Sequence, residues 1–247
     1  ASNIEKNYDW LKQYITSDTH LENISRDISL IALQGPRSRE LLSKLTDIDL
    51  EMPFYTFEDG DVSGFSVMVS RTGYTGELGF EIYANEEAVI TIWNDLIKVG
   101  AQPAGLAARD ILRMEMAYCL YGNDIDGKTN PIEAGLSWIT ALDKEKFIGF
   151  DRIQQKKLEG SNRQLVSFTM EERGIPRPGY KVNIERKNVG FVTSGTHSPS
   201  LNIGIGLAYV DTPFNKIGQQ ISIQIRDNDL GAVIIKPPFI KTTTLHH

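Results

Sequence analysis

The residues best suited to chemistry lie between Arg71 and Tyr83, in the segment RTGYTGELGFEIY. Glycines at positions 73, 76 and 79 permit backbone angles that a Cβ would forbid, so the main chain here can approach a flat ligand closely. Tyr74 can stack on such a ligand. Glu81 can accept hydrogen bonds from a ring N–H and an adjacent amino group in one bidentate, charge-assisted pair. The segment therefore predicts recognition of a flat ring.

Ordinary packing could also account for these residues. Glu81 lies in an alternating pattern in which Phe80 and Ile82 would face a core, so a solvated strand face explains it unless that face lines a pocket. An aromatic residue beside glycines, such as Tyr74, is more often packing than a ligand contact. The pattern alone leaves both interpretations open.

A second group of polar residues lies in the segment AGLAARDILRMEMAYCLYGND. Helical spacing places Arg109 and Arg113 on one face, with Tyr118 about two turns beyond Arg109. Small residues surround Arg109, so we expect its guanidinium to be partly buried and to need an anionic or multi-acceptor partner. A ligand could supply that partner. From the pattern alone, a structural ion pair is favoured, with three candidate carboxylates: Glu81, Asp110 and Glu115.

Composition excludes several classes of function. The chain has 247 residues, a net charge of -6 and a pI near 5.3, whereas nucleic-acid binding usually requires a basic surface. No apolar run is long enough to span a bilayer, and no charged-then-apolar leader opens the chain, so we expect a soluble, intracellular protein. The single cysteine, Cys119, cannot form an internal disulfide, and we expect a buried, inert thiol.

Other familiar sites are absent from the sequence. The glycine spacing at 73 to 79 matches neither a phosphate-binding loop nor a dinucleotide fingerprint. His20 and His197 are isolated, so no metal site and no Ser-His-Asp triad is predicted.

The first part of the chain alternates between strand and helix patterns. Residues 28–34 predict a strand, and Pro36 suits the first turn of a following helix. Residues 53–58 and 62–71 predict a hairpin that turns at Asp59–Gly60, and 80–84 a further strand. Asn85 is positioned to cap a helix from 86 to about 99, and 103–116 should form another. We expect an α+β domain, mixed α/β with ferredoxin-like βαβ elements.

From residue 163 onward the sequence consists of short apolar segments separated by Gly, Pro, Asn and Asp. Such regular short strands favour a small antiparallel barrel. We therefore place the domain boundary near 155–162, with an α+β domain at 1–158 and a β-barrel domain at 159–247.

Longer motifs add a family resemblance. Four segments in order, RTGYTGELGFEIY, AGLAARDILRMEMAYCLYGNDID, NPIEAGLSW and GFVTSGTHSPSLNIGIGLAYV, resemble the aminomethyltransferases, the T-proteins of the glycine cleavage system. The similarity runs from the opening ASN to PPFIK. It implies glycine catabolism and one-carbon metabolism: the one-carbon unit of the aminomethyl-lipoyl H-protein passes to tetrahydrofolate with release of ammonia. By motif position, four residues look like folate contacts: Tyr74, Glu81, Arg109 and Tyr118.

The resemblance also implies a departure. In the family a domain-sized segment of roughly a hundred residues precedes the point where this chain opens, and it carries the catalytic aspartate. That aspartate would lie upstream of Ala1, so we expect a C-terminal portion that is inactive alone, because transition-state stabilisation is lost. The closing TTTLHH is either native or part of a tag. We expect a cytoplasmic protein in a bacterium or a mitochondrial matrix protein in a eukaryote.

Three alternatives remain open at this point. The folate domain of dimethylglycine and sarcosine dehydrogenases is related, but it is fused to a flavin domain that this chain does not show. The iron-sulfur-assembly and tRNA-modification relatives carry a KGCYTGQE-type signature, which this chain lacks. A non-catalytic folate-binding or protein-interaction module is the third.

Overall fold

The computed structural model describes residues 3–246. Residue contacts divide the chain into two compact units, one of residues 1–104 with 243–247 and one of residues 105–242. The sequence predicts domains at 1–158 and 159–247, and that division stays a prediction about domain organisation. The two units are described separately.

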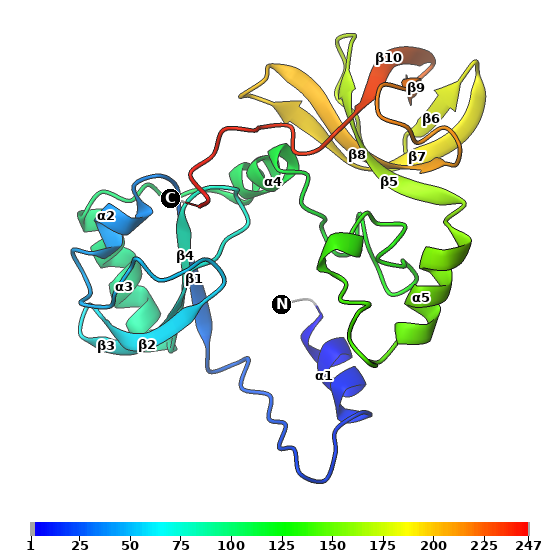
Figure 1. Cartoon of the computed structure of the whole chain (residues 1–247). Coiled ribbons are helices and arrows are strands. Elements are labelled where there is room, and N and C mark those ends of the chain that lie inside the picture. Colours follow the sequence, from blue (N-terminus) through cyan, green and yellow to red (C-terminus); the bar gives the residue numbers. More distant parts are fainter. Residues whose placement is uncertain (1–2, 247) are drawn as a thin grey trace. The chain divides into compact units, whose positions relative to one another are not determined.

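The first unit is built on an antiparallel sheet with the strand order β1-β4-β3-β2. Figure 1 shows its strands in blue and cyan with α2 and α3 beside them. Its helices are α1 (Ile4–Lys12), α2 (Ser38–Leu42) and α3 (Glu86–Lys98). Its strands are β1 (Ser29–Gln34), β2 (Phe57–Val62), β3 (Phe65–Ser70) and β4 (Gly79–Ala84).

One face of this sheet is covered by helix and the other is open. Along β4, Phe80, Ile82 and Ala84 are buried and belong to the same apolar cluster as Ile92 and Leu96 of α3. Because side chains alternate along a strand, the intervening residues of β4 extend from the opposite face. The mixed α/β prediction for this part of the chain is confirmed.

The predicted hairpin forms, but its first strand and its turn were wrongly placed, because the strand predicted at 53–58 is observed at Phe57–Val62. The register pairs Val62 with Phe65, so the turn consists of Ser63 and Gly64, whose φ angles are 52° and 80°. Two positive φ angles are typical of a tight hairpin turn that matches strand twist. Gly60 instead lies inside β2, where a Cβ would come within 2.6 Å of Ile48 Cγ1. Close packing, not a turn, therefore accounts for this glycine.

The second unit begins with helices and ends in a closed antiparallel barrel with the strand order β10-β5-β8-β7-β6-β9. Figure 1 shows these strands from yellow-green to red. The helical elements are α4 (Leu106–Glu115), the 3-10 turn η1 (Ser137–Ile139) and α5 (Phe150–Glu159). The strands are β5 (Arg163–Met170), β6 (Lys181–Ile184), β7 (Lys187–Ser198), β8 (Ile203–Asp211), β9 (Gln220–Ile225) and β10 (Asn228–Ile235). The predicted barrel is confirmed.

The barrel is filled by large apolar side chains. Phe168, Val182, Ile223 and Ile234 are almost completely buried in one cluster. Gly206 of β8 faces the Phe168 ring, which occupies the space that a Cβ would need. Within residues 3–246, no helix combines the length and apolar character needed to cross a bilayer.

The helix cap predicted at Asn85 yields a stability test. The Asn85 side chain accepts a hydrogen bond from the Ala88 N–H at 2.8 Å, and acidic residues occupy the first turn of α3. We expect Asn85→Ala to destabilise the first unit by about 1 kcal/mol, because the N–H loses its acceptor. Urea unfolding followed by circular dichroism measures this, with Asn85→Asp as a control that keeps an acceptor. An unchanged midpoint in Asn85→Ala would contradict the capping role.

The cysteine thiol yields a second prediction. Burial raises the pKa of Cys119 to about 11, from a usual 9.0. At pH 8 the thiolate fraction falls about 100-fold, while its intrinsic nucleophilicity rises by about tenfold. We expect a small disulfide reagent to react roughly tenfold more slowly with the folded chain than with the chain in denaturant. Equal rates would show an accessible thiol of ordinary pKa.

Candidate functional site

The glycine-rich segment is held by a residue that the sequence patterns did not single out, Gln34 at the end of β1. Its side chain lies against Gly73 and Gly79, and a Cβ at either position would overlap it. Gln34 Nε2 donates to the Thr72 carbonyl at 3.1 Å, and Gln34 Oε1 accepts from Thr75 Oγ1 at 3.0 Å. The two glycines thus make room for a polar side chain that fixes the loop. Their partner lies about 40 residues away, so no local pattern reveals it.

The other anchors of the loop are charged residues at its two ends. Arg71 is 2% exposed, and its Nη1 donates to the Gly79 carbonyl at 3.2 Å. Burial lowers the pKa of Arg71 from its usual value. Glu77 Oε2 accepts from the Thr244 N–H at 3.0 Å. Tyr74 is half-buried in the loop, and Gly76, two residues later, has a φ of 75° in the left-handed region.

Glu81 lies on the open face of the sheet, the face not covered by α2 and α3. It is half-buried, and its neighbours on the adjacent strands are Ala32 and Ser70. Both neighbours are small, so the space above the carboxylate is not filled by long side chains from the flanking strands. A carboxylate with small neighbours can accept two parallel hydrogen bonds from a planar ring.

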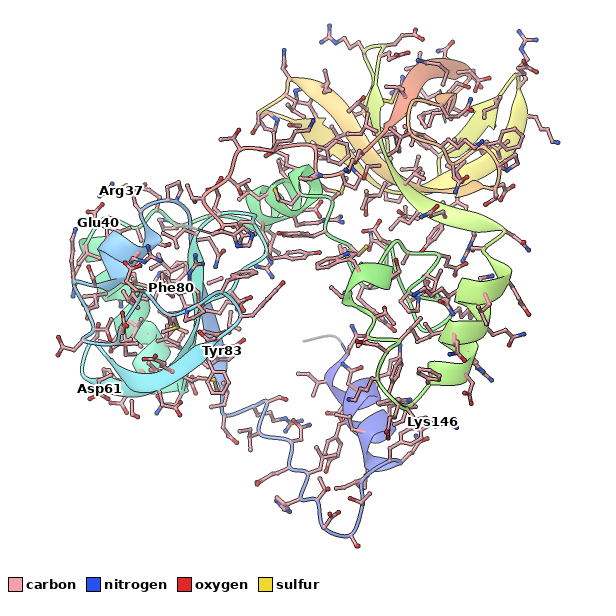
Figure 2. The ribbon with its side chains drawn as sticks, viewed as in Figure 1. Arg37, Glu40, Asp61, Phe80, Tyr83 and Lys146 are labelled. Atoms are coloured by element: carbon pink, nitrogen blue, oxygen red, sulfur yellow. The ribbon has the colours of Figure 1, made fainter. Side chains whose placement is uncertain are left out.

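The next row of the open face is larger and more apolar. Tyr83 is flanked by Leu30 and Met68, which are 47% and 36% exposed. Figure 2 labels Tyr83 together with Phe80, which is buried on the opposite face of β4. The open face therefore presents a carboxylate beside an exposed apolar surface, an arrangement that suits a ring with one polar edge.

Tyr83 was not among the candidate site residues predicted from the sequence, although its spacing of two from Glu81 indicates that both lie on one face of the strand. Residues two apart on a strand share a face. Tyr83 Oη donates to Glu81 Oε2 at 3.5 Å. Burial, and then the charge of Glu81, raises the pKa of Tyr83. The phenol therefore stays protonated at neutral pH, with its hydroxyl directed at the carboxylate.

The other two predicted residues belong to the second unit. Arg109 lies on α4 and is exposed, so the expectation that its guanidinium is partly buried is wrong. Arg113, one turn later, is 2% exposed. Tyr118 follows the end of α4 and is half-buried. The spacing therefore places one arginine at the surface and the other in the interior of the unit.

Two carboxylates considered as partners of Arg109 form other contacts. Asp110 Oδ1 lies 2.7 Å from Nε of Arg113. Glu115 is buried, where it accepts hydrogen bonds from the hydroxyls of Ser198 at 2.6 Å and Ser200 at 3.1 Å. These contacts tie the second half of α4 to its own unit.

The four predicted contacts are thus divided between the two units. Tyr74 and Glu81 lie in the first unit, on a fixed loop and the strand that follows it. Arg109 and Tyr118 lie in the second unit, on α4 and in the loop that follows it. The structure places each pair in its own unit, and a contact of any of the four residues with folate is a proposal.

Known families match this chain over most of its length. Residues 1–144 match the model described as the GCVT N-terminal domain, and residues 163–241 match the glycine cleavage T-protein C-terminal barrel domain. An aminomethyltransferase from Flavobacterium psychrophilum is 49% identical over 248 residues, covering 98% of this chain and 69% of that protein. One from Bacteroides fragilis is 47% identical with the same coverage.

A solved structure is also similar. The crystal structure of glycine cleavage system aminomethyltransferase T from Bartonella henselae has a TM-score of 0.86 and 27% identity. The match covers 96% of this chain and 66% of that one, so this chain spans about two thirds of the length of its relatives. With two family models and two curated relatives in agreement, the chain belongs to the aminomethyltransferase family, the T-proteins of the glycine cleavage system.

Proposed function

We propose that this chain binds tetrahydrofolate and that Glu81 accepts hydrogen bonds from the polar edge of the pterin ring. The pterin carries an amino group beside a ring N–H, and both can donate to the two oxygens of one carboxylate. The observation that carries the proposal is the place of Glu81: half-buried on an open sheet face, between Ala32 and Ser70. A carboxylate on an ordinary solvated face would need neither the small neighbours nor the apolar surface beside them.

The remaining contacts follow from the shape and charge of the ligand. Tyr74, held in its loop by the anchors of the glycine segment, offers a ring for stacking. Arg109, an exposed residue of α4, is suited by its charge to a carboxylate of the folate, and Tyr118 is suited to packing against one of its rings. These roles extend the family resemblance to this chain residue by residue.

The activity that we propose belongs to the whole aminomethyltransferase. Its donor is the aminomethyl group carried on the lipoyl sulfur of H-protein, and its acceptor is tetrahydrofolate. The C–S bond and the C–N bond of the aminomethyl group break, and two C–N bonds to folate nitrogens form. Ammonia and dihydrolipoyl H-protein leave, and methylenetetrahydrofolate remains. The residues of this chain supply binding and orientation, which bring the folate amines to the carbon.

Replacement of the carboxylate tests the proposal. We expect Glu81→Gln to raise the Kd for tetrahydrofolate roughly 10- to 100-fold, because a charge-assisted pair of hydrogen bonds is lost while size is kept. Anaerobic isothermal titration calorimetry measures this. Asp59→Asn is the matched control, since Asp59 pairs with Met68 on the same open face. Equal affinities of wild type and Glu81→Gln would overturn the proposed role of Glu81.

A steric variant tests the space beside Glu81 independently of charge. Ala32 is exposed on β1 and lies beside Glu81, so leucine there would fill the space above the carboxylate without disturbing the core. We expect Ala32→Leu to weaken tetrahydrofolate binding at least tenfold, with an unchanged urea midpoint. Ser66→Leu, exposed on β3 beside Asp61, is the control and should bind normally. Normal binding by Ala32→Leu would place the ligand elsewhere.

A further inference from the structure

We infer that the buried ion pair of Arg113 and Asp124 is a positioning device that holds Tyr118 in place for its ligand. The inference rests on the proposed function, because it assumes that Tyr118 contacts folate. Arg113 and Asp124 themselves are not placed against the ligand. They act through the backbone of the loop that carries the tyrosine.

Arg113 forms hydrogen bonds with both backbone polar groups of Tyr118. The Tyr118 N–H donates to the Arg113 carbonyl at 2.9 Å, and Arg113 Nη1 donates to the Tyr118 carbonyl at 3.0 Å. The preceding residue, Ala117, has a φ of 57°, a left-handed conformation that a non-glycine residue adopts at a small energetic cost. The main chain of Arg113 therefore holds the Tyr118 N–H, and its guanidinium holds the Tyr118 carbonyl, so both peptide groups that set the direction of the Tyr118 side chain are bound.

Asp124, at the far end of the loop, binds both Arg113 and the backbone of Leu120. Its Oδ2 lies 2.7 Å from Arg113 Nη1 and accepts from the Leu120 N–H at 2.8 Å. Both ends of the Tyr118–Leu120 segment are thus bound to the same pair of charges. The side chains of Arg113 and Asp124 are 2% and 0% exposed, so water does not compete for these bonds.

The barrel holds the ion pair in turn. Arg113 Nη2 donates to Ser194 Oγ at 3.0 Å, and Thr193 Oγ1 donates to Asp124 Oδ1 at 2.5 Å. Tyr209 Oη donates to the Asp124 carbonyl at 3.0 Å. These directional hydrogen bonds therefore hold the loop in a fixed position against strands β7 and β8. Strong bonds of this kind hold a side chain in position, whereas an apolar contact of the same area would let it slide.

A buried ion pair need not stabilise a fold, since its desolvation can cost as much as its attraction gains. Replacing it with apolar residues would often be tolerated in a purely structural role. The number of bonds that this pair directs to one three-residue segment favours a role in positioning instead. The two roles differ in their consequences for binding.

A double-mutant cycle on tetrahydrofolate affinity tests this. We expect Asp124→Asn to raise the Kd about tenfold at a temperature where circular dichroism shows it folded. In a Tyr118→Ala background, Asp124→Asn should raise the Kd no further, because the residue that it positions is gone. Glu133→Gln, which alters the separate ion pair with Arg163 in the same unit, is the control and should leave the Kd unchanged.

Ser194→Ala keeps the test informative if Asp124→Asn does not fold. It removes a single bond to Arg113, and we expect a two- to threefold rise in Kd that again vanishes with Tyr118→Ala. Effects that add in the double mutant, or an unchanged Kd in the folded single mutant, would overturn the inference. If Glu81→Gln weakens binding and Tyr118→Ala does not, the inference fails alone. If neither variant weakens binding, the proposed function fails with it.

Discussion

The alternation of side chains along β4 is the constraint on which the proposed recognition depends. Phe80, Ile82 and Ala84 enter the core beneath α3, and this burial fixes the register of the strand. A shift of one residue would bury Glu81 and expose the core, at a cost that no contact on the open face could offset. The position of the carboxylate is therefore set by apolar residues that never touch a ligand. Hydrophobic packing provides the precision that recognition of a ring edge requires.

The glycine segment before β4 extends the same logic to a loop. Its glycines make space for Gln34, and Arg71 and Glu77 tie its ends to neighbouring carbonyl and N–H groups. A loop bound at this many points loses little further conformational freedom when a ligand arrives, so more of the contact energy remains as affinity. In the second unit, Arg113 and Asp124 serve the loop after α4 in a similar way. In both units a polar side chain from another element holds the backbone beside a proposed ligand contact.

The sequence predicted the features that local chemistry determines. The Asn85 cap, the barrel and the strands other than the first of the hairpin follow from period, propensity and turn residues, and the structure confirms them. The prediction placed the hairpin turn at Gly60, because the sequence does not distinguish a glycine that forms a turn from one that makes room for a side chain such as Ile48. The contacts of Gln34 with Thr75 and of Arg113 with Ser194 join residues far apart in sequence, so only the fold reveals them. The expected burial of Arg109 failed because small neighbours permit close packing but do not require it.

A crystal structure of this chain with tetrahydrofolate would test the central claim most directly. The account predicts that the pterin lies on the open face of the first unit, with its amino group and adjacent ring N–H each within hydrogen-bond distance of a Glu81 carboxylate oxygen. A bound pterin with no polar contact to Glu81 would contradict it. So would a pterin seated away from Ala32 and Ser70.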